Sequence, residues 1–327
     1  MTAGRWFLAL SVLTAPWSPP ALAQPTFAEL ARAGQLPYRG ELVINGRTIV
    51  RVSHGGPGLQ RQEVLAPPDL AGELVVDNGQ TRWHYSPRTM RVDLAPSSYG
   101  LRRPEHNQHL LERNFHLVVI RSEPVAGRPA TEIELRPRYA GRNSQRLWID
   151  AATGLPLKVQ RLSPRGVVLE TSEFRHLEPH ATIGRSEFEF ALPPRARVTS
   201  SVQVLAMGRS LADLHMPVPF PIRMPGYLPA GFDVMDVQIF ERGGVRSVHW
   251  RLSDGLDMLS LFQTAREHEA PRPAGAQVVT LPHVATGFMV DHGPERMLCW
   301  QTGAGSFSLV GDLGPDELER IADSTSP

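Results

Sequence analysis

Hydrophobic and polar residues alternate over short stretches of the chain, and turn-forming residues separate these stretches. Residues 74–85 give the clearest case, because Asn78-Gly79 at their centre tolerates the positive φ angles of a tight hairpin turn. Pairing the strands outward from this turn collects the apolar positions on one face: Leu74, Val76, Thr81, Trp83 and Tyr85. Met90, Val92 and Leu94 alternate with charged residues in the strand that follows. This pattern predicts an antiparallel sheet with one apolar face.

The same pattern recurs through residues 24–192. Asn45-Gly46 predicts an earlier hairpin, and later strands are expected near 117–121, 130–136, 146–149, 155–162 and 167–174. Short helices are expected at 27–33 and 104–113. We therefore expect an antiparallel meander of about ten strands, with too few helices to cover its apolar face.

A proline-rich stretch at residues 193–225 interrupts the strand pattern. Prolines cannot donate to a strand ladder, so this stretch is predicted to be a linker outside any sheet. A second sheet is expected in 226–327, where a turn at Asp254-Gly255 and a helix starting at Gly314-Pro315 are predicted. The hairpin at this turn should bury Val248, Trp250, Leu252, Leu259 and Leu261 on one face. The helix should bury Leu318, Ile321 and Ala322.

The first 23 residues have the features of an export signal. Arg5 precedes an apolar stretch of signal-peptide length, and Ala21-Leu-Ala23 is a small-x-small cleavage site. An uncleaved membrane anchor is the alternative. The expected organisation is a signal peptide at 1–23, a curved-sheet domain at 24–192, a linker at 193–225 and a sheet-and-helix domain at 226–327. After cleavage we expect a soluble periplasmic protein without a membrane span.

Composition excludes several protein classes. The chain has 41% hydrophobic and 20% charged residues and a formal net charge of +1. These values exclude a disordered chain and a strongly basic nucleic-acid binder. Cys299 is the only cysteine, which excludes an internal disulfide and favours a buried strand residue over a reactive thiol.

No catalytic motif is present: the sequence lacks a phosphate-binding loop, a nucleophile elbow and a helical zinc-protease motif. Glu105, His109, Glu112 and His116 share one side of the predicted helix, and their spacing could hold a metal. We interpret them as a solvated polar face, so no metal, cofactor or catalytic residue is predicted. A triad assembled only in space would be invisible in the sequence, which leaves an exported hydrolase open.

An apolar sheet face without enough helical cover must curl, pair or hold a ligand. A curled sheet would enclose a pocket suited to an acyl chain, since each buried methylene contributes about 0.8 kcal/mol. The alternative is that the same residues simply pack under the helices. The candidate pocket residues are Leu74, Val76, Trp83, Tyr85, Met90, Val92 and Leu94.

The order of several short motifs resembles that of the RseB/MucB family of exported negative regulators of sigma-E-type factors. The resemblance rests on Leu228-Pro-Ala-Gly-Phe232, Arg251-Leu-Ser-Asp-Gly-Leu256 and Val310-Gly-Asp-Leu-Gly-Pro315 in the C-terminal part. In the N-terminal part it rests on Arg146-Leu-Trp-Ile-Asp150 and Gly154-Leu-Pro-Leu-Lys158. It implies a mainly β (α+β) fold, with a LolA/LolB-like curved antiparallel half-barrel and a smaller C-terminal sheet with a terminal helix.

The resemblance also implies a function. A member of this family binds the periplasmic domain of a membrane anti-sigma factor and senses a lipid or lipoprotein, and so controls envelope-stress transcription. It brings no catalytic residues and no nucleic-acid partner, and it does not identify the surface that contacts the partner. The alternative function on the same fold is a periplasmic carrier or scavenger of lipids or lipoproteins, with an acyl-chain ligand.

Overall fold

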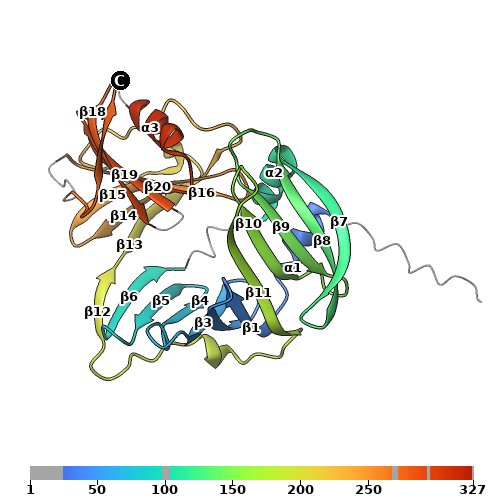
Figure 1. Cartoon of the computed structure of the whole chain (residues 1–327). Helices are drawn as coiled ribbons and strands as arrows, with labels where there is room; N and C mark the ends of the chain where they lie inside the picture. The colour runs from blue at the N-terminus through green and yellow to red at the C-terminus, as the bar shows by residue number, and fades with distance from the viewer. Residues whose placement is uncertain (1–24, 98–103, 267–271, 293–294, 326–327) are drawn as a thin grey trace, which may run out of the picture.

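The computed structural model describes residues 25–97, 104–266, 272–292 and 295–325 of the chain. The predicted signal segment 1–23 lies outside these residues. The described chain is mainly β, as predicted, and forms two open sheets of twelve and eight strands (Figure 1).

The twelve-stranded sheet consists of two meanders rather than the one predicted. β1 to β6 form the first meander and β7 to β11 the second, and antiparallel pairing of β1 with β11 joins them. The strands of the first meander are β1 Tyr38–Ile44, β2 Thr48–His54, β3 Leu59–Ala66, β4 Leu74–Asn78, β5 Thr81–Ser86 and β6 Arg91–Pro96. Those of the second are β7 Phe115–Val125, β8 Arg128–Pro137, β9 Ser144–Asp150, β10 Pro156–Leu162 and β11 Val168–Pro179.

Two helices cover one face of the second meander. They are α1 (Phe27–Ala33) and α2 (Pro104–Asn114), which lie where the sequence predicts them. α1 begins with a capping box, in which the Thr26 hydroxyl accepts from the Glu29 N–H and the Glu29 carboxylate accepts from the Thr26 N–H. The helices bury Ala33 and Leu111 against the sheet, which leaves most of the first meander without helical cover.

The two predicted hairpins are present, but the turn at Asn78-Gly79 differs from the prediction. Asn45 and Gly46 have φ angles of 51° and 67°, as the predicted tight turn requires. At Asn78-Gly79 the loop is longer than predicted, and Asp77 pairs with Arg82. The carboxylate of Asp77 and the amide oxygen of Asn78 accept main-chain N–H groups within this loop and stabilise it. Because the register moves by an even number of residues, every side chain keeps its predicted face.

The prediction that residues 193–225 lie outside any sheet is wrong. β12 (Arg197–Ser201) pairs in parallel with β6, and β13 (Gln203–Gly208) pairs with β14 of the eight-stranded sheet. The chain therefore passes from one sheet to the other at Val202. The prolines flank these two strands rather than interrupt them, which is why proline content alone misassigned the segment.

The second part of the proline-rich stretch lies against the core of the eight-stranded sheet. Val218, Phe220, Ile222 and Met224 alternate with prolines and pack on the buried cluster of that sheet. Gln263, fully buried on β16, donates to the Pro221 carbonyl at 2.8 Å and accepts from the Arg223 N–H at 2.9 Å. A single core amide thus satisfies the main chain of a segment whose prolines cannot pair as a strand.

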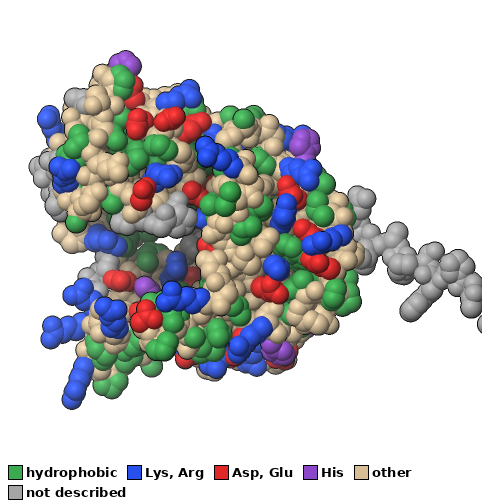
Figure 2. Space-filling model, viewed as in Figure 1, with side chains coloured by type: hydrophobic (Ala, Val, Ile, Leu, Met, Phe, Trp, Pro, Cys, Tyr) green, Lys and Arg blue, Asp and Glu red, His purple; other side chains and the backbone are tan. Residues whose placement is uncertain are grey.

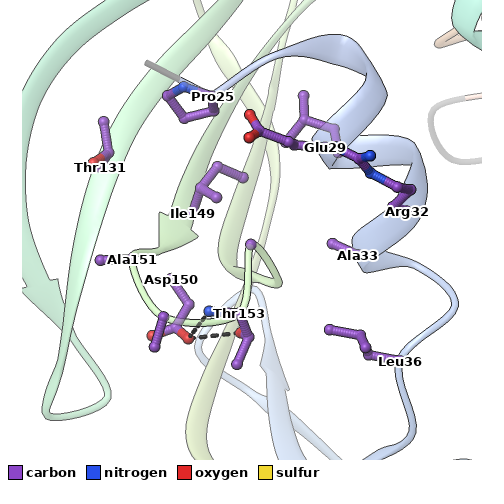
Figure 3. Close-up of a pocket in the computed structure, with 13 residues that line it drawn as sticks. Pro25, Glu29, Arg32, Ala33, Leu36, Thr131, Ile149, Asp150, Ala151 and Thr153 are labelled. Carbon is purple, nitrogen blue, oxygen red and sulfur yellow. Dashed lines mark hydrogen bonds between the residues drawn. The ribbon is translucent and has the colours of Figure 1, made fainter. Parts of the chain in front are cut away.

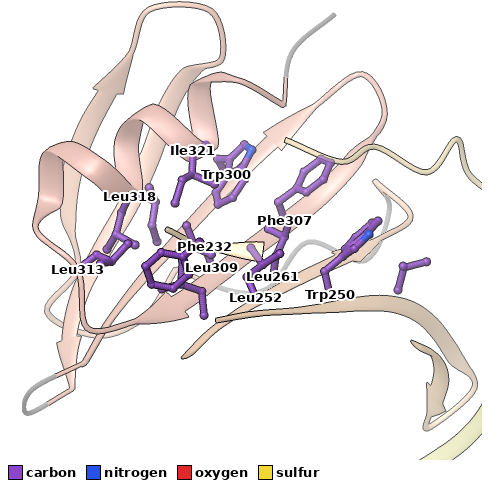
Figure 4. Close-up of a cluster of buried hydrophobic side chains, with 14 of the residues drawn as sticks. Phe232, Trp250, Leu252, Leu261, Trp300, Phe307, Leu309, Leu313, Leu318 and Ile321 are labelled. Atoms are coloured by element: carbon purple, nitrogen blue, oxygen red, sulfur yellow. The ribbon is translucent and has the colours of Figure 1, made fainter. Parts of the chain in front are cut away.

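The eight-stranded sheet is antiparallel and has one deeply buried face. The two predicted sets of core residues, those of the hairpin and those of the helix α3 (Pro315–Asp323), are at most 1% exposed. α3 lies across this face, and Trp300 stacks on Phe307 with ring centroids 5.3 Å apart (Figure 4). The remaining strands are β14 Asp233–Arg242, β15 Val245–Ser253, β16 Met258–Thr264, β17 Gln277–Leu281, β18 Ala285–His292, β19 Glu295–Thr302 and β20 Gly305–Gly311; the short 3-10 helices are η2 Arg185–Phe188 and η3 Leu211–Asp213.

Candidate functional site

Six of the seven predicted pocket residues lie on β4, β5 and β6, and pairing brings them together. Leu74 pairs with Tyr85, and Val76 pairs with Trp83, which in turn pairs with Leu94. Val76 and Val92 are fully buried. Met90 differs from the prediction, because it occupies the turn before β6 with a φ of 53° and accepts a 3.4 Å hydrogen bond from the Tyr85 hydroxyl at its sulfur.

This apolar face is not the one that carries α1. The row of paired residues that contains Val76 continues through Arg61 and Ser53 to Arg39. The Glu187 carboxylate accepts from the side chains of Arg39 and Ser53, so η2 lies on that face. Tyr38, the neighbour of Arg39 on the strand, points the other way and packs in the cluster that contains Ala33 of α1.

The chain covers part of this apolar face with its own aromatic side chains. Phe190 stacks on Trp83 with ring centroids 5.9 Å apart and lies 6.2 Å from the Tyr85 ring. Phe188 is 1% exposed and packs against the main chain at Gly55. The sequence reasoning missed this cover, although Phe188 and Phe190 are the two large apolar residues of the segment 185–190.

A larger hollow lies between the two sheets. It has a volume of about 900 Å³ and opens between the end of β6, β13 and the face of β14–β16 opposite α3. The space-filling view shows the molecule hollowed between the part that carries the eight-stranded sheet and the part that carries β4–β6 (Figure 2). Apolar side chains form much of its wall: Ala95, Pro96, Val202, Val204, Met207, Phe240, Val245 and Phe262. We call this space the inter-sheet cavity.

His249 is the most unusual polar residue of this wall. Its ring stacks on Phe262 with centroids 4.2 Å apart, and its Nε2 atom is buried without a hydrogen-bond partner. Burial, and then the charge of Arg251, lower the pKa of His249 to about 4. The imidazole is therefore neutral at pH 7, and its buried Nε2 could bond to a polar group of a bound molecule.

Arg251 marks the boundary with a second hollow. Its guanidinium makes a bidentate ion pair with Asp236, with Nε 2.9 Å from Oδ2. On the far side of Arg251 lies a space of about 480 Å³, walled by α1, α2, His54 and the β15–β16 hairpin. Together the two hollows run along the side of the eight-stranded sheet that faces the twelve-stranded sheet.

The β15–β16 hairpin closes the far end of these hollows by docking on α2. Asn114 is 1% exposed, and its side-chain amide donates to the carbonyls of Gly231 and Asp254, each at 2.7 Å. Gly255 has a φ of 108°, and a Cβ atom there would lie 3.0 Å from the main-chain nitrogen of Leu111. This contact needs a glycine, which gives the Ser-Asp-Gly-Leu motif a structural reason.

A smaller pocket of about 350 Å³ lies between α1 and the β9–β10 turn (Figure 3). Asp150 is the buried acid of its wall, but Arg128 and Thr153 already bond its carboxylate. Burial alone would raise the pKa of Asp150; the bonds from Arg128 and Thr153 outweigh burial and lower the pKa. This carboxylate is thus a structural anion rather than an acid or base poised for catalysis.

The described residues provide no metal site. Within 25–97, 104–266, 272–292 and 295–325, no three histidine, cysteine, aspartate or glutamate side chains are grouped to hold an ion. Glu112 of the predicted polar helix face instead accepts from Gln108 at 2.8 Å. Burial raises the pKa of the Cys299 thiol, which disfavours a nucleophilic thiolate. Among the helices that the structure describes, none has the length and apolar character needed to cross a bilayer.

Comparison with known proteins identifies relatives of both halves. Residues 47–192 match the family model of the MucB/RseB N-terminal domain. The sigma factor AlgU regulatory protein MucB of Pseudomonas aeruginosa is 24% identical over 216 residues, which are 65% of this chain. That match spans 61% of MucB, less than two thirds of its length. An uncharacterized protein of Methanocaldococcus jannaschii is 20% identical over 260 residues, 77% of this chain and 75% of that protein.

Solved structures extend the similarity in fold to nearly the whole chain. The complex structure of Pseudomonas aeruginosa MucA/MucB matches with a TM-score of 0.59 and 20% identity, over 90% of this chain and 95% of that chain. MucB in complex with MucA(peri) matches with a TM-score of 0.59 and 21% identity, over 91% and 96%. The matched N-terminal domain, the MucB relative and the shared two-sheet fold agree, and residues 47–192 of this chain are similar to the N-terminal domain of the MucB/RseB family.

Proposed function

We propose that this protein is a periplasmic, non-enzymatic regulator that binds the periplasmic part of a membrane anti-sigma factor and so controls envelope-stress transcription. One observation carries the proposal. The two-sheet fold extends over 90% of the chain in common with MucB, in a structure described as a MucA/MucB complex. The absence of a catalytic motif in the sequence agrees with a protein that acts by binding.

We assign the partner to the inter-sheet cavity. A bound segment needs an apolar surface for affinity and a few polar groups for register. The cavity offers Val204, Met207 and Phe240 as apolar contacts, and the main-chain edge of β13 borders it. Arg242 is exposed at its wall and could pair with an acidic residue of the segment.

Capture from cells tests this proposal. The tagged protein should retain the anti-sigma factor of the same bacterium, and deletion of its gene should raise transcription from a promoter of the matching sigma factor. Met207, which is 45% exposed, provides the variant Met207→Asp, which should reduce capture at least tenfold. Val167, which is 61% exposed in the β10–β11 turn, provides the matched control Val167→Asp. Capture by Met207→Asp equal to that by Val167→Asp would contradict the assignment of the cavity, and the absence of capture by the wild type would contradict the function.

A second function is a lipid or lipoprotein carrier, which we propose on the size of the inter-sheet cavity. Ligand pockets of about 300–1,000 Å³ bury most of a small apolar molecule. Phe190 packs on Trp83 and Tyr85, two of the seven residues first proposed for the ligand, so the inter-sheet cavity provides the better candidate. Organic extraction of the purified protein followed by mass spectrometry should then detect acyl chains. A protein that carries none and does not bind a fluorescent fatty acid would exclude the carrier function.

A further inference from the structure

The end of the β15–β16 hairpin carries two aspartates that face the twelve-stranded sheet. Asp254 is 2% exposed and Asp257 is 8% exposed. The Asp254 carboxylate accepts from the N–H groups of Leu256 and Asp257, which fixes the turn, as the sequence predicts for this residue. The turn does not use the Asp257 carboxylate, which points across the junction between the sheets.

The Asp257 carboxylate is linked through Asn143 to Asp312 and Arg161. The side-chain amide of Asn143, in the loop before β9, donates to Asp257 and to Asp312, at 3.1 Å to each. Asp312 follows β20 and pairs with Arg161 of β10 at 2.5 Å. One amide from the twelve-stranded sheet therefore bridges two acids of the C-terminal part, and a buried contact between the sheets depends on their charges.

The charges at this junction are not balanced. Asp254, Asp257 and Asp312 bring three carboxylates, while Arg161 pairs directly with Asp312 alone. The other cation, Arg142, is 4% exposed and is engaged by Glu317 and the Ala230 carbonyl. Burial first, and then the charges of Asp254 and Asp312, raise the pKa of Asp257 to about 7, although Arg161 and Asn143 act in the opposite direction.

We propose that Asp257, with Asn143 and Asp312, forms a proton-dependent latch that holds the β15–β16 hairpin against the twelve-stranded sheet. With Asp257 protonated, Asp254 and Asp312 are the charged acids of the cluster, Arg161 pairs with Asp312, and the buried contact is stable. Loss of that proton places a third negative charge in a nearly dry site, which favours release of the hairpin. The latch depends on this chain alone and goes beyond the proposed function, whatever partner binds.

The direction of the pH dependence follows from the pKa values. In the released hairpin Asp257 is exposed, and its pKa returns toward about 3.9. The closed junction therefore holds more protons between about pH 4 and 7, and acidification favours closure. One proton changes the ratio of open to closed molecules by at most about tenfold per pH unit.

Hydrogen–deuterium exchange of the hairpin tests the latch. In the wild-type protein, the opening constant of residues 253–258, corrected for the intrinsic exchange rate, should rise with pH up to about pH 7 and then level off. Asp257→Asn mimics the protonated acid, so it should keep the hairpin protected and abolish this rise. Asp291→Asn, at an exposed acid that pairs with Arg296, is the matched control and should behave as the wild type.

A second variant tests the latch independently if Asp257→Asn does not fold. Asp312→Asn removes one of the neighbouring charges that raise the pKa of Asp257, so the rise should move to lower pH. A rise that persists unchanged in Asp257→Asn, or that does not move in Asp312→Asn, would overturn the latch. So would an opening constant that does not change with pH in the wild type.

Discussion

The side-chain amide of Asn114, the last residue of α2, donates a 2.7 Å hydrogen bond to the main-chain oxygen of Asp254, at the end of the β15–β16 hairpin. The same amide bonds the Gly231 carbonyl, which lies at the start of the C-terminal part. One buried side chain thus anchors two separate segments of the C-terminal part to the twelve-stranded sheet. Because the junction closes one end of the inter-sheet hollows, its stability bears directly on the proposed binding surface.

Replacement of Asn114 by alanine should lower the free energy of unfolding by about 1–3 kcal/mol, because the buried Asp254 carbonyl loses its donor, while the Gly231 carbonyl keeps the bond from Arg113. Urea denaturation followed by circular dichroism measures this loss. Gln108→Ala is the control on the same helix, since the bond from Gln108 to Glu112 is exposed. This control should change stability by less than about 0.5 kcal/mol. A loss for Asn114→Ala no larger than that of the control would refute the anchoring role.

Gly255→Ala should destabilise the protein more than alanine at a glycine with open surroundings. A Cβ atom at Gly255 would press on Leu111, whereas at Gly166, with a φ of 77°, it would meet nothing within 4 Å. Gly166→Ala thus measures the cost of the positive φ alone, about 1 kcal/mol. We expect Gly255→Ala to cost about 1–3 kcal/mol more than this. Equal melting temperatures of the two variants would show that the hairpin does not need close contact with α2.

Phe188→Ala should cost about 3–4 kcal/mol, because it empties a buried site between η2 and the first meander. Leu192, which is 53% exposed four residues later, provides the control Leu192→Ala. The comparison tests whether segment 185–190 is a fixed cover over Val76 and Trp83. If Phe188→Ala is as stable as Leu192→Ala, the cover is dispensable and the apolar face beneath it becomes a ligand candidate again.

His249 should make the protein less stable in acid. Its pKa is about 4 in the folded state and about 6.5 in the unfolded chain, so only the unfolded chain takes up a proton between these values. The unfolding free energy should therefore fall by about 2–3 kcal/mol through this residue as the pH drops from 6.5 to 4. In His249→Phe this contribution should vanish, as measured by urea denaturation at several pH values. Parallel pH profiles of the two proteins would contradict the buried neutral imidazole.

Local periodicity correctly predicted the features that depend on contacts between residues close in the sequence. The apolar face of β15 and β16 and the packing stripe of α3 lie where alternation and helix-start residues place them. Their neighbours are close in sequence, so turn chemistry and side-chain alternation specify them almost completely. The four-residue loop at Asn78 left the predicted faces of β4 and β5 unchanged, because it shifts their pairing by an even number of residues.

Contacts between residues far apart in the sequence could not be predicted from local patterns. Alternation shows that Val76 and Trp83 share a face, but not that Glu187 and Phe190, more than 100 residues later, cover it. The prolines before β12 and after β13 concealed the two strands that join the sheets. Asp257 has an ordinary sequence context, and only the fold places Asp312 and Asn143 beside it. These contacts depend on loop closure and packing, for which a single sequence carries no local signal.

A titration of the purified protein with the periplasmic segment of the anti-sigma factor from the same bacterium tests whether this protein binds that factor. Isothermal titration calorimetry should give saturable binding with a dissociation constant of about 1 μM or tighter, about −8 kcal/mol. Met207→Asp should weaken this binding at least tenfold, and Val167→Asp should leave it unchanged. No heat of binding at partner concentrations up to about 100 μM, with both components folded, would show that this protein is not a regulator that binds an anti-sigma factor.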